Sequence, residues 1–278
     1  MKNRKENEPL ISIVMSVKNG SLSLDKCLNS ILNQTFAKWE FIICDDGSSD
    51  DSLRILHRYA SEDSRFVILH NETNMGLAYS LNRCISFSKS NILARQDCDD
   101  YSDIHRFERQ YDFIVRHPEY AIVGTYWSNV DEFGNITKKE ILCQPTVDDM
   151  IRGGVFMHPT WMMQKNLLEK VGFYTVNKYT MRSQDYHLVL KLFGEGMKIY
   201  NMPEFLYFYS ADSSTINRSK VSLRNMKRIK ALMWIRFDGY KRNHVSIWKY
   251  IYVLKPLLIA LIPQFVLNNY YRSVYGKA

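Results

Sequence analysis

The stretch Phe41-Ile42-Ile43-Cys44-Asp45-Asp46-Gly47-Ser48-Ser49-Asp50 joins an apolar run directly to a cluster of carboxylates. A second junction of this kind follows further along the chain, where Ile92-Leu93-Ala94 leads through two residues into Asp97-Cys98-Asp99-Asp100. Both apolar runs are typical of buried strands, and the ligands of open α/β sheets bind at the carboxyl ends of such strands. Two groups of carboxylates there suit an oxygen-preferring divalent metal, and such a metal suits a diphosphate. We therefore expect an enzyme that handles a metal-bound nucleotide.

Each acidic cluster also has a simpler structural interpretation. The first could be a strand end, a glycine turn and a helix N-cap, because Ser and Asp are good caps and acids favour helix N-termini. Capping does not explain the additional acid. The second could be an exposed turn, since turns favour Asp, although adjacent carboxylates repel each other unless a cation or solvent relieves them. The sequence leaves both alternatives open.

Length and composition indicate a globular chain. Its 278 residues, 46% of them hydrophobic, suffice for one large domain or a domain with an appendage. The segment from Met1 to Pro9 is polar and lacks the apolar run of a secretory signal. The cysteines have no paired spacing, so we expect neither a disulfide framework nor a zinc site. A reducing, cytoplasmic location is the resulting expectation.

Charge is distributed unevenly along the chain, whose formal net charge is +8. From Ser213 to Ala278 there are 13 Lys and Arg residues against one acid, Asp238, so this segment carries +12 and the remainder −4. An acidic body and a basic rear segment are expected to have different partners.

Hydrophobic periodicity predicts strands that alternate with helices, which is typical of a parallel sheet with right-handed crossovers. The predicted strands are Leu10–Val17, Trp39–Cys44, Phe66–His70, Ser90–Arg95 and Tyr120–Val130. The predicted helices are Leu24–Gln34, Ser52–Ala60, Gly76–Ser88, His105–Arg116 and Pro145–Ile151, the last with Thr146 as its cap.

The C-terminal part changes character. Leu223 to Phe237 is predicted to be a helix, and Ile247 to Tyr271 is strongly apolar and aromatic. Lys249, Lys255 and two prolines interrupt the second stretch, so it falls short of the roughly 20 clean apolar residues that a spanning helix needs. We predict a polar tail at residues 1–9, a main domain at 10–215 with halves at 10–100 and 101–215, and a basic, apolar helical extension at 216–278.

Several motifs follow one another in a characteristic order. They are Ser12 to Asn19, Trp39 to Asp50, Asn74-Met75-Gly76, Ala94 to Asp100 with its Asp-x-Asp, Gly154 to Phe173 with His158-Pro159-Thr160, and Ser183-Gln184-Asp185-Tyr186. In this order, over roughly Ile11 to Ser214, they resemble glycosyltransferase family 2, inverting enzymes with the nucleotide-sugar-binding GT-A fold. The resemblance implies an α/β fold with a mostly parallel central sheet. One departure is Tyr209-Ser210-Ala211-Asp212, where many family members have Tyr-Arg-x-His.

The resemblance also implies roles for particular residues. Asp185 would be the catalytic base, and Asp97 and Asp99 would hold Mn²⁺ or Mg²⁺, with Asp212 a candidate third ligand. On the acceptor side it places His158, Trp161 and Gln184. The residues implied to bind the nucleotide-sugar are Val17, Asn19, Asp45, Asp46, Asn74, Gly76, Gln96, Asp97 and Cys98.

Some of these residues could instead have purely structural roles. Asp185 could cap a helix from Tyr186 to Phe193, because Asp is common at that position. His158 could be a structural histidine, and Trp161 could belong to the core.

As a whole, the resemblance predicts a metal-dependent inverting transferase (EC 2.4) that moves a sugar, best guessed as a UDP-sugar, onto a glycan or lipid-linked acceptor in surface polysaccharide synthesis. The basic, aromatic C-terminal segment suggests peripheral attachment to the inner face of a membrane. Nucleic-acid binding is not expected, because no recognition module is evident. The rivals are a non-catalytic carbohydrate- or lipid-binding protein on a decayed transferase fold and a nucleotidyltransferase, although Lys18-Asn19-Gly20-Ser21 lacks the latter's Gly-rich loop.

Overall fold

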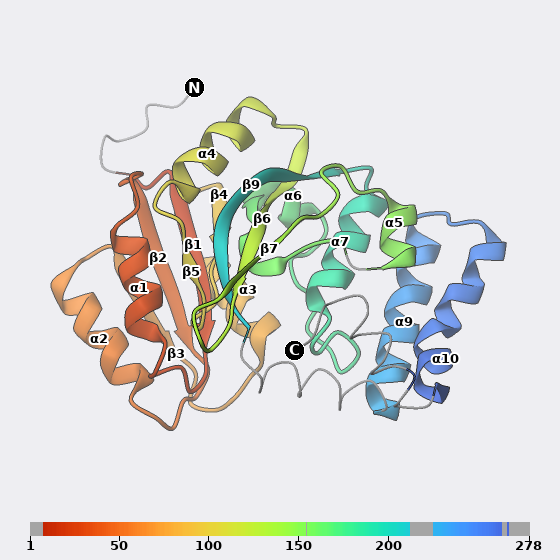
Figure 1. Cartoon of the computed structure of the whole chain (residues 1–278), viewed down its shortest axis with the longest axis horizontal. Coiled ribbons are helices and arrows are strands. Elements are labelled where there is room, and N and C mark those ends of the chain that lie inside the picture. Colours follow the sequence, from red (N-terminus) through yellow and green to blue (C-terminus); the bar gives the residue numbers. More distant parts are fainter. Residues whose placement is uncertain (1–7, 154, 212–224, 263–265, 267–278) are drawn as a thin grey trace.

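Figure 1 shows a computed structural model in which one curled sheet is flanked by helices. The structure describes residues 8–153, 155–211, 225–262 and 266. Within these residues the strands follow the order β3-β2-β1-β4-β8-β6-β9-β5, and β7 pairs with β6 at the side. The fold is the α/β arrangement that the sequence predicts.

Four parallel strands form the first half of the sheet. They are β1 (Ile11–Val17), β2 (Trp39–Asp45), β3 (Phe66–His70) and β4 (Ile92–Arg95). The helices that connect them are α1 (Leu24–Leu32), α2 (Ser52–Glu62) and α3 (Leu77–Phe87). The predicted alternation is confirmed here, and it brings the carboxyl ends of β1, β2 and β4 to one edge of the sheet.

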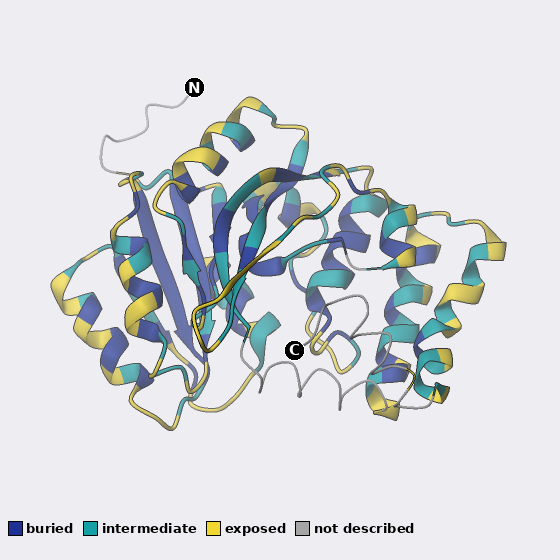
Figure 2. Cartoon of the chain, viewed as in Figure 1, coloured by how far each residue is buried: buried dark blue, intermediate teal, exposed yellow. Residues whose placement is uncertain are grey.

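Both faces of these strands are covered. Ile13 and Met15 of β1 pack in one apolar cluster together with α1, whereas Val14 packs in another together with α3, because successive side chains point to opposite faces. Every residue of β2 is buried. Figure 2 shows the result as dark blue central strands and helices whose outer sides are yellow. Two covered faces explain why the strands read as continuous apolar runs.

The second half of the sheet mixes strand directions. Strand β8 is antiparallel to both β4 and β6, β6 is parallel to β9, and β9 is antiparallel to β5. The elements in chain order are β5 (Tyr101–Ser102), α4 (Arg106–Arg116), β6 (Tyr120–Val130), β7 (Ile136–Lys139), α5 (Val147–Arg152), a 3-10 turn (His158–Thr160), β8 (Met162–Gln164), α6 (Lys165–Lys170), α7 (Gln184–Gly194) and β9 (Lys198–Ser210).

The predicted cap of α5 is confirmed. The hydroxyl of Thr146 accepts a hydrogen bond from the backbone N–H of Asp149 at 3.4 Å, and the Asp149 carboxylate accepts one from the backbone N–H of Thr146 at 2.9 Å. This reciprocal pair is a capping box.

The described part of the C-terminal segment is helical, as predicted. It consists of α9 (Met226–Arg242), a 3-10 stretch (Ile247–Leu254) and α10 (Lys255–Leu261), which lie beyond α7 at the right of Figure 1. Helix α9 packs on α7. No helix in the described part of the chain has the length and apolar character needed to cross a bilayer. The predicted domain boundary after residue 215 lies outside the described residues.

Candidate active site

Asp46 joins three loops at the carboxyl edge of the sheet. Its carboxylate accepts hydrogen bonds from the backbone N–H groups of Met75 (2.8 Å) and Gly76 (2.9 Å) and from the side chain of Asn71 (2.8 Å). Its own backbone N–H donates to the carbonyl of Val17, 2.7 Å away. Val17, Asp46 and Gly76, which the sequence predicts to bind the nucleotide-sugar, are therefore brought into one cluster.

Asp45 has a buried side chain with one unsatisfied oxygen. Its Oδ2 atom accepts a hydrogen bond from the backbone N–H of Ser48 at 3.2 Å and lies 3.0 Å from Nδ1 of His70. Its Oδ1 atom is buried and has no hydrogen-bond partner within the residues described by the structure. A buried acceptor without a donor costs roughly 1–3 kcal/mol. A ligand donor would relieve that cost.

Neither Asp45 nor Asp46 caps the next helix. The N-cap of α2 is Asp51, and the backbone N–H of Ser52 donates to the carboxylate of Asp50 at 3.0 Å. The capping interpretation therefore applies only to Asp50 and to Asp51, which directly follows the motif.

Asn19 fastens the loop after β1 to the loop after β2. Its backbone N–H donates to the hydroxyl of Ser48 at 2.9 Å, and its side-chain oxygen accepts from the backbone N–H of Ser49 at 2.8 Å. Gly47 permits this close packing, because a Cβ there would lie 2.9 Å from the carbonyl carbon of Thr73, and its φ is +69°. A side chain at position 47 would be strained in both respects.

The Asn74 side chain sits beside these loops. Its oxygen accepts a hydrogen bond from the backbone N–H of Gly76 at 3.0 Å, next to the bond that the same N–H makes with Asp46.

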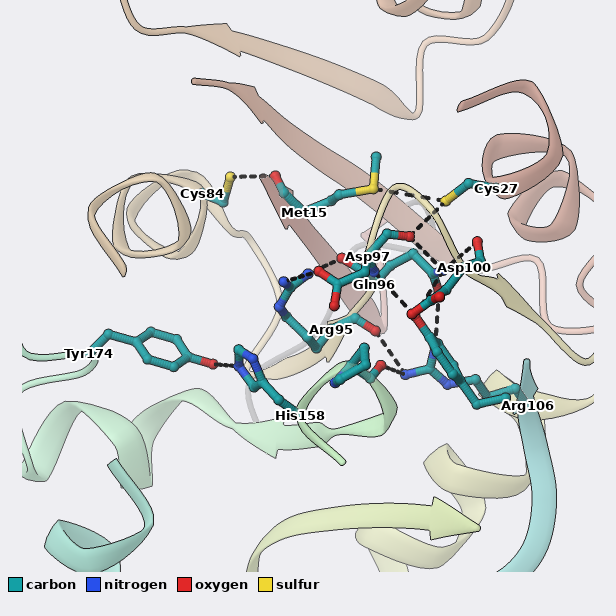
Figure 3. A network of polar contacts seen from close by, with 12 residues as sticks. Met15, Cys27, Cys84, Arg95, Gln96, Asp97, Asp100, Arg106, His158 and Tyr174 are labelled. Atoms are coloured by element: carbon teal, nitrogen blue, oxygen red, sulfur yellow. Dashed lines mark hydrogen bonds and ion pairs between the residues drawn. The ribbon is translucent and has the colours of Figure 1, made fainter. Parts of the chain in front are cut away.

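The acids after β4 are divided between solvent and interior. Asp97 is partly exposed and forms an ion pair with the buried Arg95 guanidinium, whereas Asp99 is exposed. Asp100 is buried and accepts hydrogen bonds from the hydroxyl of Tyr207 (3.0 Å) and the backbone N–H of Ser210 (2.8 Å). Figure 3 shows Asp97 and Asp100 on either side of Gln96. The exposed-turn interpretation therefore describes only part of this motif.

Burial raises the pKa of the Asp100 carboxyl, and the neighbouring charges of Asp97 and Asp99 raise it further. Asp100 thus belongs to the interior rather than to the set of ionised ligands.

Gln96 is fully buried and hydrogen-bonds within the protein. Its amide N–H groups donate to the backbone carbonyls of Asp97 (3.1 Å) and Asp100 (3.2 Å), and its oxygen accepts from Ser102 (2.9 Å) and Arg106 (3.0 Å). These contacts shape the acidic loop. Gln96 therefore lies behind the surface of the predicted nucleotide-sugar site and holds the acidic loop in place.

Cys98 lies against the loop that follows β1. Its sulfur is 3.1 Å from the position that a Cβ on Gly20 would occupy. Burial raises the pKa of the Cys98 thiol, so the thiol stays protonated and unreactive.

The acceptor half contributes a buried histidine and two aromatic rings. Nε2 of His158 lies 2.7 Å from the hydroxyl of Tyr174, and its ring packs edge-on against Trp161 at 4.6 Å between centroids. Figure 3 shows the His158–Tyr174 pair next to Arg95. Burial lowers the pKa of His158 well below its usual range, and the Arg95 charge lowers it further. His158 is therefore neutral. Trp161 is fully buried, which fits its interpretation as a core residue beneath the acceptor side.

Asp185 lies in the first turn of α7, beside the buried Gln184. The N-cap of this helix is Ser183, so Asp185 lies inside the helix rather than at the cap. Burial raises the pKa of Asp185, a hydrogen bond from the backbone N–H of Tyr186 opposes the shift, and the negative charge of Asp97 adds to it. Asp185 therefore lies within electrostatic reach of Asp97, although the two residues come from different halves of the chain.

The carboxylates can be tested as metal ligands. Among residues 8–153, 155–211, 225–262 and 266, no three His, Cys, Asp or Glu side chains gather as a ready-made metal site. Asp97 and Asp99 supply the oxygen donors that Mn²⁺ and Mg²⁺ prefer, at a surface that solvent reaches. Asp212, the candidate third ligand, lies outside the described residues. The donor set thus fits a hard divalent ion bound by two protein carboxylates and by ligand oxygens.

Comparison with known proteins decides the family. Residues 12–186 match the family model described as Glycosyl transferase family 2. The protein of Bacillus subtilis (strain 168) named "Putative glycosyltransferase EpsE" is 35% identical over 266 residues, which cover 95% of this chain and 94% of that protein. The chain belongs to glycosyltransferase family 2. It is accordingly a transferase of the EC 2.4 class.

Solved structures support the fold of this family 2 member. S. aureus TarS 1-349 in complex with UDP-GlcNAc superposes with a TM-score of 0.68 at 17% identity, covering 96% of this chain and 76% of TarS. The mannosyltransferase PcManGT from Pyrobaculum calidifontis, in complex with GDP-Man and Mn²⁺, gives a TM-score of 0.64 at 13% identity, over 96% of this chain and 80% of that one. At these identities the likeness concerns the fold.

Three residues of the glycosyltransferase site were not singled out from the sequence. They are Arg106, Tyr174 and Tyr207, all fully or nearly fully buried. Nothing in their local sequence distinguishes a buried arginine or tyrosine from an exposed one. The one available signal is that a row of acids needs compensating cations nearby.

The raised pKa of Asp185 leads to a stability prediction. The folded protein holds a proton on Asp185 to a higher pH than the unfolded chain does, so ionisation of this carboxyl lowers stability as the pH rises between the two pKa values. Asp185→Asn should therefore unfold at higher denaturant concentration than the wild type at neutral pH, and the gain should shrink toward acid pH. Urea titrations at several pH values measure it.

Asp112→Asn is the control, because Asp112 is an exposed carboxylate on α4. A pH-independent loss of stability in Asp185→Asn would contradict the assigned burial.

Proposed function

We propose that this chain is a metal-dependent inverting glycosyltransferase that moves a sugar from a nucleotide-sugar, first of all a UDP-sugar, to a hydroxyl of a glycan or lipid-linked acceptor in surface polysaccharide synthesis. The proposal rests on family 2 membership together with the placement of Asp97 directly after β4 and of Asp185 in the first turn of α7, within electrostatic reach of each other. Such a pair fits a donor diphosphate on one side and an acceptor hydroxyl on the other.

The nucleoside would lie over the ends of β1 and β2. The unsatisfied Oδ1 atom of Asp45 is suited to accept a hydrogen bond from a base or ribose donor. Asp46, Asn19 and Asn74 hold the surrounding loops, and Val17 and Gly76 line the same cluster through their backbone bonds. The loops are fixed before the donor binds, which lowers the entropy cost of binding.

Asp99 and Asp97 would hold the metal, and a bound Mn²⁺ or Mg²⁺ supplies Lewis-acid stabilisation of a leaving diphosphate. Arg95 keeps Asp97 oriented through its ion pair. Cys98 and the buried Gln96 fix the course of the chain between the acids.

Asp185 would accept the proton of the acceptor hydroxyl as its oxygen bonds to the anomeric carbon and the bond to the diphosphate breaks. One such displacement inverts the anomeric configuration. The raised pKa of Asp185 makes it a stronger base than an ordinary surface carboxylate. Gln184, which precedes it in α7, and the hydrogen-bonded pair of His158 and Tyr174 would shape the acceptor side.

Turnover of a panel of UDP- and GDP-sugars, with Mn²⁺ or EDTA and with lipid-linked acceptor extract, tests the proposal. We expect metal-dependent release of one nucleoside diphosphate. Asp185→Asn should lower kcat by roughly 10²–10⁴-fold, because a general base is lost, while nucleotide binding by calorimetry persists. Asp99→Ala should abolish the metal dependence of binding.

Asp112→Ala is the matched control for these variants and should behave as the wild type. An Asp185→Asn enzyme with full activity would refute the base assignment. Absence of turnover and of metal-dependent nucleotide binding across the whole panel would favour a binding protein on a decayed fold.

We further propose that the C-terminal helices attach the enzyme to the inner face of an anionic membrane. Large apolar side chains are exposed along this segment at alternating spacings of three and four residues, namely Ile247 (71%), Ile251 (64%), Leu254 (43%), Leu258 (54%) and Leu261 (73%), together with Trp248 (85%). The segment from Ser213 onward carries +12. An apolar stripe within a basic segment matches the interface of an anionic bilayer.

Flotation with vesicles of phosphatidylglycerol and phosphatidylcholine tests the membrane proposal. Trp248→Glu should weaken vesicle binding by roughly tenfold or more, since it removes a large apolar group from the interface and adds repulsion. Phe133→Glu is the matched control, because Phe133 is equally exposed at 83% but lies in the turn between β6 and β7.

Equal vesicle binding by Trp248→Glu and wild type would reject membrane attachment through this stripe. Loss of a dimer in Trp248→Glu, without any vesicle binding by the wild type, would assign the stripe to a second copy of the chain instead.

A further inference from the structure

Helix α9 contacts the helix that carries Asp185. The Nε2 atom of His187, two residues after Asp185, lies 3.1 Å from the Asp238 carboxylate of α9. The same carboxylate accepts a hydrogen bond from the Arg242 guanidinium at 2.6 Å. His187 is buried at 2% exposure and the Asp238 side chain is 24% exposed, so this polar contact lies at the edge of the α7–α9 interface.

The two helices approach closely at one glycine. A Cβ on Gly239 would lie 2.4 Å from Cδ1 and 3.0 Å from Cβ of Leu190, so only glycine fits at this crossing. One turn further, the Asn243 side chain donates to the backbone carbonyl of Leu190 at 2.9 Å. The polar bonds on either side of the crossing fix how far α7 can slide or rotate against α9.

A second contact from α9 reaches the chain before Asp185. The rings of Trp234 and Tyr179 are stacked, with 5.1 Å between centroids and 18° between planes, and Trp234 also lies 5.5 Å from the His187 ring. Tyr179 belongs to the loop that leads into α7. Helix α9 therefore supports the chain on both sides of Asp185.

The charge state of the polar contact is defined. Burial lowers the pKa of His187 although Asp238 opposes the shift, so the imidazole is neutral and donates through Nε2. Burial by itself would raise the pKa of Asp238. Hydrogen bonds from Arg242 and His187 lower it by more, so the pKa lies below its usual value and the carboxylate stays ionised. A buried neutral donor facing a carboxylate is a directional bond that holds one geometry.

We propose that Asp238 and Trp234 are positioning residues for transfer, which act through His187 and Tyr179 to hold Asp185 in place in the first turn of α7. This inference rests on the proposed role of Asp185 as the base. The nucleoside and metal parts of the site are built from the loops after β1, β2 and β4, whereas the main contacts of α9 within the described residues are with α7, the 3-10 stretch Ile247–Leu254 and α10. Loss of either support should therefore impair the chemical step and spare donor binding.

The size of the effect follows from the geometry of catalysis. A displacement of about 1 Å in a catalytic group costs on the order of a hundredfold in rate. Asp238→Asn and Trp234→Leu should each lower kcat by roughly ten- to a hundredfold, with donor KM and nucleotide affinity unchanged. Asp238→Glu and Trp234→Phe, which keep the charge or the ring, should recover part of the loss.

Matched controls separate this effect from general destabilisation. Asp112→Asn removes an acid from an i,i+4 pair with Arg116 on α4, as Asp238→Asn does with Arg242 on α9. Phe237→Leu removes an exposed aromatic ring from α9 itself, on the side that contacts Tyr250. Both controls should keep the wild-type kcat.

Amide hydrogen exchange gives a readout that does not depend on turnover. In Asp238→Asn and Trp234→Leu the amides of residues 179–188 should exchange faster, while those of β1, β2 and β4 stay protected. Unchanged exchange there, or a kcat loss that the controls share, would overturn the inference. If exchange rises as expected but Asp185→Asn is fully active, the base assignment fails and the support of α7 by α9 stands.

Discussion

Two buried guanidinium groups, those of Arg95 and Arg106, compensate the negative charge of the aspartates at the carboxyl edge of the sheet. Arg95 pairs with Asp97, and Arg106 donates to Gln96, Ser102 and Gln110 as well as to the backbone carbonyls of Arg95 (2.8 Å) and Pro159 (3.0 Å). Burial lowers the pKa of Arg106 to about 10, which still leaves it charged at neutral pH. Removing one partner of such a buried charged network costs about 3–5 kcal/mol, because the remaining groups lose their compensation. Arg106 also ties β4 to the 3-10 turn of the acceptor half, so the two halves meet at this residue.

This network places the three aspartates after β4 in different environments. Asp100 turns inward to Tyr207, Asp97 is partly exposed and pairs with Arg95, and Asp99 is exposed. Asp185 lies in the first turn of α7, in the other half of the chain. Residues from both halves of the chain thereby meet around the same buried polar network. The C-terminal helices add a third layer, because α9 holds the helix of Asp185 while the segment beyond it exposes its apolar stripe. Membership of family 2 accounts for the two halves of the main domain, and the contacts of α9 with α7 connect them to the C-terminal helices.

The sequence predicts the first half of the fold well because its strands are buried on both faces and its helices are amphipathic, so each element has a local signature. The second half is harder. Strand β8 has three residues within an apolar run, and β6 and β9 pair with register shifts that interrupt the alternation. The acids at strand ends were identifiable, since strand termini define a common edge. Their inward or outward orientation was not, because it depends on Arg106 and Tyr207, whose burial only the tertiary structure determines.

The most direct test of this account is a crystal structure of Asp185→Asn with Mn²⁺ and the nucleotide-sugar that the turnover panel identifies, with the metal located by anomalous scattering. We predict Mn²⁺ in contact with Asp99 or Asp97 and with the diphosphate, the nucleoside over the ends of β1 and β2, and the anomeric carbon between the metal and residue 185. A donor bound elsewhere, or a sugar on the side of the metal away from residue 185, would contradict it.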